Sequence, residues 1–210
     1  MKKEMKPMFL DNEKIPKLKT GTTTMGVVCV DGVVLATESQ ATMGYLVATK
    51  DAVKLFKITN RIGMTIAGGV ADCQQIIKTL SALLAIRELE LGRPTLVKAA
   101  AQLTAVMLFQ NRMFPYYSAL LLGGYDEEGT HLYSLDPFGS LIEEKNFTSV
   151  GSGSIVGFGV LEANYKEKMT VKEGIELVKR AVDAAKKRDI ASGGKIQIAT
   201  ITNEGFKFAN

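Results

Sequence analysis

Lys19-Thr20-Gly21-Thr22-Thr23-Thr24-Met25-Gly26 is the stretch where a charged leader gives way to the first strand pattern of this 210-residue chain. A run of threonines behind one glycine suits a backbone that is cut by its own side chain, because Gly21 has no Cβ to block its carbonyl. If the Gly21–Thr22 bond opens, Thr22 gains a free α-amine beside its own Oγ, which places nucleophile and general base in one residue. An α-amino group titrates at about 7.7–8.0, so part of it is unprotonated near neutral pH. The same residues also fit a Ser/Thr-rich turn before a strand, and both interpretations stay open on the motif alone.

The composition favours one globular domain behind the leader. The chain holds 26 basic and 22 acidic residues, and the basic ones are spread rather than striped, so no nucleic-acid-binding surface is indicated. A length of 210 residues suits one core of ordinary size. We therefore expect a propeptide at residues 1–21, a single domain at residues 22–210, and proteins as partners.

The leader and the cysteines place the chain in a reducing compartment. Residues 1–21 lack an apolar stretch of signal-peptide length, and Pro7 and Pro16 interrupt any helix there. No apolar run approaches the ~20 residues of a membrane span. Cys29 and Cys73 lie in an apolar strand pattern and a helix pattern, without a CxxC spacing. We expect buried thiols, no zinc site, no membrane association and a cytoplasmic protein.

Two apolar runs after the threonine motif predict a β-hairpin. Residues 27–30 and 33–36 are rich in β-branched side chains, and Asp31-Gly32 between them favours a type I′ turn. Both runs are apolar at every position, whereas a half-exposed strand would alternate. We therefore expect an inner strand pair that is covered on both faces.

A strand expected over residues 52–56 carries a lysine on an apolar face. In a strand, Lys54 lies on the same side as Ala52 and Phe56. A strand lysine is most often a solvated edge charge. Its apolar neighbours also fit a desolvated lysine, whose lowered pKa is a common functional device.

The next segments predict a strand and then two helices. Residues 64–67 form the strand, and Gly68-Gly69 either simply stops it or exposes backbone N–H groups to a ligand. A first helix ends at Gly92, and a second is capped by Thr95 and ends before Pro115. The expected apolar faces consist of Ile76, Ile77, Leu80, Leu83, Leu84 and Leu91, and of Leu96, Ala99, Leu103, Val106 and Met107.

The last part of the chain repeats this order. Strands are expected over residues 119–122 and 131–135, and a helix runs from residue 154 to about residue 165. Thr170-Val171-Lys172-Glu173 is a capping-box pattern that begins a helix reaching Arg188. Strands follow at residues 196–201 and 206–208. The whole predicts an α+β fold with two stacked antiparallel sheets between two helix pairs.

Several other chemistries lack support in the sequence. His131 is the only histidine, and it lies in a strand after an acidic turn with no partner expected nearby for a Ser-His-Asp triad. The glycines of residues 151–157 miss the dinucleotide-binding spacing by one position. No tight His/Cys/carboxylate set indicates a metal. We expect no cofactor, and an N-terminal nucleophile needs neither histidine nor metal.

Five motifs, in register from Thr22 to about Thr202, resemble those of the proteasome β-subunit family in its archaeal type with one catalytic β chain. They are Gly21 with Thr22-Thr23-Thr24-Met25-Gly26, Asp51-Ala52-Val53-Lys54-Leu55-Phe56, Ala67-Gly68-Gly69, Gly151-Ser152-Gly153-Ser154 and Arg188-Asp189-Ile190-Ala191-Ser192-Gly193-Gly194. The resemblance implies the four-layer αββα sandwich of N-terminal-nucleophile hydrolases and a threonine-type endopeptidase activity. It also implies autolysis between Gly21 and Thr22, which removes residues 1–21 as a propeptide.

The same resemblance implies roles for individual residues. Thr22 is then the nucleophile with its amine as base, Glu38 and Lys54 are its acidic and basic partners, and the Gly68 N–H is the oxyanion donor. The hydrogen-bonded set around the amine consists of Ser152, Asp189 and Ser192. Relatives commonly carry arginine where this chain has Gln40, which leaves open any charge pair that holds Glu38.

Substrate binding is implied in two parts. Thr42 and Gly68 pair with the substrate backbone as a β-strand would, so that peptides are bound through main-chain hydrogen bonds. The pocket for the residue before the cut presents no charge and favours apolar side chains. Its lining residues are Ala41, Ala52, Ile66, Val70 and Gln74.

The resemblance further implies assembly. Seven-membered β rings stack between rings of α-type subunits, and an ATP-dependent unfoldase feeds unfolded proteins to the internal chamber. Two alternatives remain from the sequence: a non-catalytic structural subunit of the same fold, and an amidohydrolase of the same fold that acts on small amides.

Overall fold

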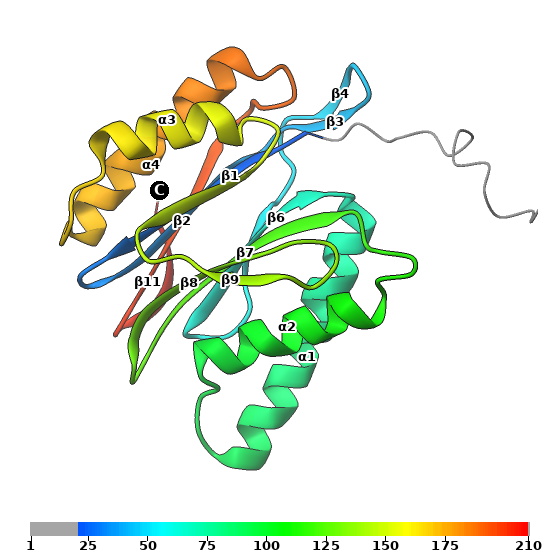
Figure 1. Cartoon of the computed structure of the whole chain (residues 1–210), viewed down its shortest axis with the longest axis vertical. Coiled ribbons are helices and arrows are strands. Elements are labelled where there is room, and N and C mark those ends of the chain that lie inside the picture. The colour runs from blue at the N-terminus through cyan, green and yellow to red at the C-terminus, as the bar shows by residue number, and fades with distance from the viewer. Residues whose placement is uncertain (1–20, 210) are drawn as a thin grey trace, which may run out of the picture.

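The protein folds into four layers, with two antiparallel sheets stacked between two pairs of helices (Figure 1). The structure is a computed structural model, and it describes residues 21–209. The layers confirm the expected α+β sandwich. The predicted propeptide, residues 1–21, lies outside the described residues except for Gly21. Over residues 21–209, no helix has the length and hydropathy that a membrane span requires.

The first sheet carries Thr23 and Thr24 of the threonine motif on an inner strand. Its strand order is β10-β1-β2-β11-β12. The strands are β1 (Thr23–Cys29), β2 (Gly32–Glu38), β10 (Phe147–Gly151), β11 (Ile196–Thr202) and β12 (Gly205–Ala209). On one face, Met25 and Val34 pack with Leu177 of the helix layer. On the other face, Leu35 packs with Leu121 of the second sheet. The prediction of a hairpin covered on both faces is therefore confirmed.

The second sheet has the strand order β5-β6-β7-β8-β9, and a short hairpin stands apart from both sheets. The strands are β5 (Leu55–Lys57), β6 (Ile62–Gly68), β7 (Ser118–Asp126), β8 (Gly129–Leu135) and β9 (Leu141–Glu143), and the hairpin is β3 (Ala41–Met43) with β4 (Leu46–Thr49). The sequence patterns did not predict β3, β4, β9 or β10, which are only three to five residues long. β5 begins at Leu55 rather than at Ala52 as expected.

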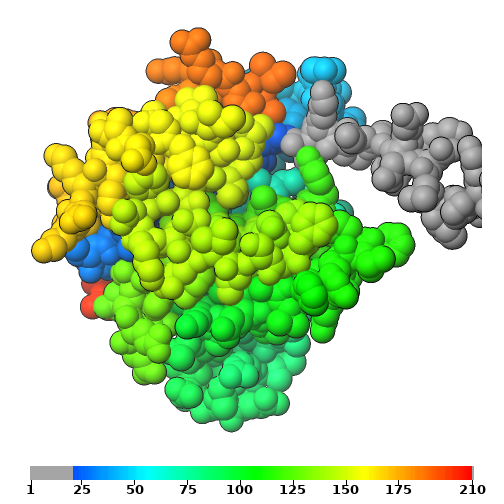
Figure 2. Space-filling model, in the orientation of Figure 1, coloured from blue at the N-terminus to red at the C-terminus, as the bar shows by residue number. Residues whose placement is uncertain are grey.

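Each sheet has its own pair of helices. α1 (Val70–Leu91) and α2 (Val97–Gln110) cover the second sheet, while α3 (Ser154–Asn164) and α4 (Val171–Arg188) cover the first. The two pairs lie at opposite ends of the molecule in Figure 2. The capping box of α4 is confirmed, since the Glu173 N–H donates to Thr170 Oγ1 and the Thr170 N–H donates back to Glu173 Oε2 at 2.8 Å.

The predicted turn of the first hairpin is wrong. Val30 and Asp31 form the turn, and Gly32 is already paired with Cys29. Neither turn residue has a positive φ, which a type I′ turn requires at both central positions. Gly32 is needed for packing instead, because a Cβ there would lie 2.4 Å from the Ile201 carbonyl oxygen.

The predicted cap of α2 is wrong, and its predicted apolar face is correct only in part: Leu103 and Met107 pack against the core, whereas Val106 is half exposed. Leu96 rather than Thr95 is the N-cap residue, and it makes no side-chain cap bond. Asp126 Oδ2, at the end of β7, instead accepts from the Val97 N–H at 2.7 Å. The buried positions of α2 are Val97, Ala100, Ala101, Thr104 and Leu108. An aspartate distant in sequence therefore replaces the local cap, and the fully buried stripe of the helix lies beside the expected face rather than on it.

The first helix departs from expectation near its C-terminal half. Leu83 and Leu91 were placed on its apolar face, but both are exposed. The other four expected positions are buried, and Gly92 ends the helix in the left-handed conformation as predicted. α1 thus extends beyond the sheet that it covers, and its last turns contribute little to the core.

Candidate active site

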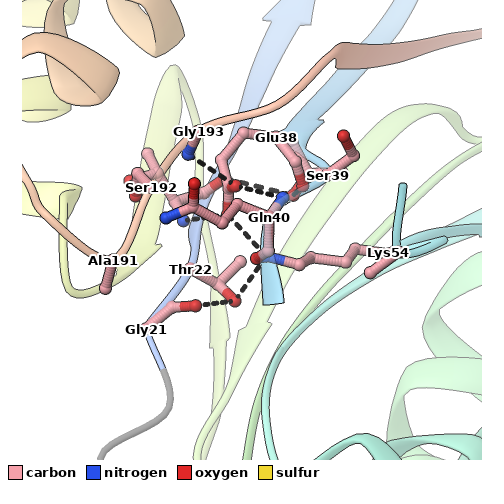
Figure 3. A network of polar contacts seen from close by, with 12 residues as sticks. Gly21, Thr22, Glu38, Ser39, Gln40, Lys54, Ala191, Ser192 and Gly193 are labelled. Carbon is pink, nitrogen blue, oxygen red and sulfur yellow. Dashed lines mark hydrogen bonds and ion pairs between the residues drawn. The ribbon is translucent and has the colours of Figure 1, made fainter. Parts of the chain in front are cut away.

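Thr22 lies directly before β1 and is buried, with 4% of its surface exposed. Its hydroxyl donates to the Gly21 carbonyl oxygen at 2.7 Å and accepts from Lys54 Nζ at 3.0 Å. Its main-chain N–H donates to Ser152 Oγ at 3.1 Å. The Thr22 hydroxyl therefore contacts both the carbonyl group that a cut after Gly21 would open and a lysine ammonium (Figure 3).

The packing around position 21 also requires a glycine. A Cβ on Gly21 would lie 1.9 Å from Ala191 Cβ and 2.8 Å from Ser152 Oγ. The Gly21 N–H donates to Thr42 Oγ1 at 3.2 Å. A larger residue here would push away the loop that carries Ala191, so the glycine also brings that loop close to Thr22.

Lys54 is buried and makes a contact with each of its three N–H donors. Nζ donates to Thr22 Oγ1 at 3.0 Å, to Glu38 Oε1 at 2.5 Å and to the Gln40 carbonyl oxygen. Burial lowers the pKa of the Lys54 ammonium, and the Glu38 carboxylate opposes that shift. The interpretation of Lys54 as a solvated edge lysine is wrong.

Glu38 ends β2 with its side chain fully buried. Besides Lys54, it accepts from the main-chain N–H groups of Gln40 at 2.7 Å, Gly193 at 2.9 Å and Thr23 at 3.3 Å. One ammonium and these N–H groups satisfy the carboxylate. Glu38 is therefore held in place by these contacts although residue 40 is glutamine rather than arginine.

Asp189 joins two serines on the other side of Thr22. Ser152 Oγ donates to Asp189 Oδ2 at 2.5 Å, and Ser192 Oγ donates to the same oxygen at 2.6 Å. The Ser192 hydroxyl also contacts Thr23 Oγ1 at 2.6 Å. Asp189 is the C-cap residue of α4, so the end of that helix sets the position of this group.

Gly68 ends β6 beside Thr22, at φ +125°. A Cβ there would lie 2.2 Å from the Tyr117 carbonyl oxygen. Both the backbone conformation and the close approach of residue 117 require glycine.

A cavity of about 250 Å³ opens beside Thr22, Lys54 and Gly68. All seven residues expected to contact substrate lie in its wall: Ala41, Thr42, Ala52, Ile66, Gly68, Val70 and Gln74. Val53 and Phe56 also line the cavity and were not assigned to it. Both belong to the motif of residues 51–56 that contains Lys54, and this was the sequence signal that could have assigned them to the cavity. Gly193 was likewise quoted only as part of a motif, although its N–H reaches Glu38.

His131 and the cysteines lie outside this group. His131 does have acidic neighbours, contrary to expectation: Nε2 lies 3.3 Å from Asp126 Oδ1 and Nδ1 lies 3.4 Å from Glu143 Oε1. Cys29 and Cys73 are buried and free as predicted, and burial raises the pKa of each thiol to about 12. Among residues 21–209, no cluster of His, Cys, Asp and Glu has a metal-binding arrangement.

Comparison with known proteins identifies the relatives of this chain. The family model described as "Proteasome subunit" matches residues 18–201. A protein named proteasome subunit beta from Methanosarcina mazei is 45% identical over 198 residues, which is 94% of this chain and 93% of the relative. Proteins of the same name from Methanocorpusculum labreanum and Methanocaldococcus fervens are each 48% identical, over 91% and 89% of this chain and 90% and 84% of their own length.

Proposed function

The chain belongs to the proteasome family and is of the β type, and we propose that it is a threonine endopeptidase with Thr22 as its nucleophile. The observation that carries the proposal is the 3.0 Å contact between Lys54 Nζ and Thr22 Oγ1 in a buried site. A positioned ammonium in such surroundings stabilises the alkoxide that attack requires. Relatives of this type are hydrolases, and the contact favours a catalytic chain over a structural one.

The first reaction is the removal of residues 1–21. Thr22 Oγ adds to the Gly21 carbonyl carbon and gives up its proton, and the Gly21–Thr22 C–N bond breaks as the nitrogen is protonated. The ester that forms on Oγ is hydrolysed by water, which releases the leader and leaves Thr22 with a free amine. The 2.7 Å contact between Thr22 Oγ1 and the Gly21 oxygen places the hydroxyl beside this bond.

The mature reaction uses the new amine as general base. The amine takes the Oγ proton while Oγ attacks a substrate carbonyl, and later returns a proton to the leaving nitrogen. Gly68 N–H stabilises the oxyanion of the tetrahedral intermediate. Ser152 contacts the Thr22 nitrogen and Asp189 contacts Ser152, so this pair orients the amine. Water then hydrolyses the acyl ester.

The substrate proposed is an extended polypeptide. Thr42 and Gly68 lie in the cavity wall where an added strand can bond to the main chain. The apolar lining favours cleavage after apolar residues. We further propose β rings between α-type rings, with an ATP-dependent unfoldase supplying unfolded proteins, and a cytoplasmic location.

Intact mass of the assembled protein tests the proposal directly. Wild-type particles should contain a chain that begins at Thr22, and Thr22→Ala particles should keep residues 1–21 and cleave no peptide. Thr24→Ala is the matched control, because that hydroxyl bonds the Ala36 carbonyl and not the site. Thr24→Ala particles should still lose residues 1–21.

Two results would overturn the proposal. One is a Thr22→Ala chain that is still cut after Gly21 in the absence of other active chains. The other is a native mass of a monomer or dimer with turnover of small amides, which would favour the amidohydrolase alternative.

A further inference from the structure

Gln40 touches both sides of the proposed active site. Its N–H donates to Glu38 Oε2 at 2.7 Å, and its carbonyl oxygen accepts from Lys54 Nζ. Its side-chain Nε2 donates to the Ile190 carbonyl oxygen at 3.1 Å. The residue is 6% exposed, so water has little access to these bonds. Figure 3 shows Gln40 between Lys54 on one side and the loop of Ser192 and Gly193 on the other.

The loop after α4 depends on such polar contacts. Ile190 is 79% exposed, so apolar packing does not anchor the loop there. Other bonds to the end of β2 attach later residues, since Gly193 bonds Glu38 through its N–H and Ser39 through its carbonyl oxygen. The Gln40 side-chain amide, by contrast, reaches the earlier part of the loop at Ile190. It therefore helps to fix this part of the loop, together with the contacts of Ser192 with Thr23 and of Asp189 with Ser152.

The absence of a side chain at Gly193 leaves room for the Gln40 side chain. A Cβ on Gly193 would lie 2.4 Å from Gln40 Oε1. Gly193 is not in the left-handed region, so its backbone conformation does not require glycine. A larger residue at position 193 would therefore require the Gln40 side chain to move, which couples positions 40 and 193 in this chain.

The charges that face Thr22 are few. Glu38 comes from β2, Lys54 from the segment before β5, and Asp189 from the end of α4. Lys195 lies before β11, but its ammonium pairs with Asp51 in solvent. Gln40 adds no charge, so among residues 21–209 the charged groups around Thr22 are two carboxylates and one buried ammonium.

We propose that Gln40 is a positioning residue that ties the loop carrying Asp189 and Ser192 to the Lys54–Glu38 pair without adding a second cation beside Glu38. This inference rests on the proposed function of Thr22. An arginine at position 40 would repel the protonated Thr22 amine and lower its pKa. The neutral Gln40 therefore keeps the amine protonated to a higher pH than arginine would.

The experiment compares wild-type particles with Gln40→Met, Gln40→Arg and the control Gln75→Met, an exposed glutamine on α1 that bonds Thr79. Methionine keeps the length of the side chain and removes the hydrogen bond. We expect the loss of this bond to lower kcat about three- to tenfold, the fold-change that corresponds to the net free energy of one hydrogen bond. KM should stay within about twofold, and the pH profile of kcat should keep its acid limb.

Gln40→Arg tests the charge. Its acid limb should move to lower pH, and Gln40→Glu should move it to higher pH, which supplies the test if the larger arginine prevents assembly. Native mass of each variant particle verifies the ring, and Gln75→Met should match wild type.

A Gln40→Met kcat equal to wild type, or a change in KM alone, would overturn the positioning role. An acid limb that does not move in the charged variants would overturn the role of the missing charge. These results differ from failure of the proposed function, which would show as activity in Thr22→Ala particles whatever residue occupies position 40.

Discussion

The two sides of Thr22 differ in burial and in the atom they touch. On one side, Lys54 and Glu38 are buried, and the ammonium contacts the hydroxyl. On the other side, Ser152 is exposed and Asp189 is half-buried, and the serine contacts the nitrogen. Charge interactions are stronger where water is excluded. The buried side should therefore matter in every attack by Oγ, and the exposed side chiefly once the nitrogen is a free amine.

The largest expected effect comes from the buried side. Lys54→Ala should lower peptide turnover by about 10²–10⁴ and should impair leader removal as well, because both need the same Thr22 alkoxide. Lys54→Arg should rescue neither fully, since a planar guanidinium does not replace a compact ammonium. Intact mass and peptide turnover of assembled particles measure the two effects.

Lys57→Ala is the matched control, because Lys57 is an exposed lysine of β5 that bonds Asn60. Lys57→Ala particles should remove the leader and cleave peptides at the wild-type rate. Normal processing of Lys54→Ala, with turnover within about threefold of wild type, would contradict the role of Lys54.

The second effect is a shift in pH dependence. Burial lowers the pKa of Lys54, and Glu38 partly restores it. The alkaline limb of turnover should therefore lie below the ordinary range of a lysine. Glu38→Gln removes the restoring charge, so the limb should move to still lower pH, and turnover near neutral pH should fall by roughly 10–10². A limb that stays in place would show that Glu38 does not tune Lys54.

The sequence could predict those features whose signals lie close together along the chain. The α4 capping box lies within four residues, and the first hairpin within about a dozen, so local patterns were sufficient for both. The short strand β10 pairs with β1 more than a hundred residues away. Its five residues carry too little pattern to predict without that partner.

The errors in α2 and in the first turn have the same origin. The α2 N-terminus is satisfied by Asp126, and Gly32 is required by the Ile201 carbonyl. Both are contacts between strands or layers, which a local motif does not contain. The site residues were expected from motifs as a set, whereas the amide contact of Gln40 with Ile190 spans 150 positions and has no sequence signature.

The third prediction separates the two sides of Thr22. Asp189→Asn should lower peptide turnover by roughly 10–10², while leader removal should be affected less, because the Thr22 nitrogen is not yet a base in the precursor. The time course of leader loss, followed by mass, is compared with turnover of particles that have completed it. If leader removal and peptide turnover fall equally, the exposed side acts in both reactions, as the buried side does.

The smallest expected effect concerns the cavity on the Lys54 side. Its wall offers apolar side chains, and Lys54, the charged residue that lines it in the described part of the chain, is already paired with Glu38. Burying a large apolar side chain contributes roughly 1.5–3 kcal/mol, so peptides cut after Leu or Tyr should turn over faster than those cut after Arg or Glu.

Val70 offers a way to reverse this preference. It lines the cavity at the first turn of α1 and is 47% exposed. A carboxylate is tolerated at a helix N-terminus, so Val70→Glu should fold, and it should raise turnover after Arg relative to Leu. Val70→Gln, of nearly the same shape but neutral, should leave the ranking unchanged. Fluorogenic peptides that differ only in the residue before the cut measure all three proteins. Faster cleavage after charged residues in wild type, or the same ranking in Val70→Glu, would mean that the residue before the cut does not lie in this cavity. The Lys54 side would then act on the hydroxyl alone and have no part in selecting substrates.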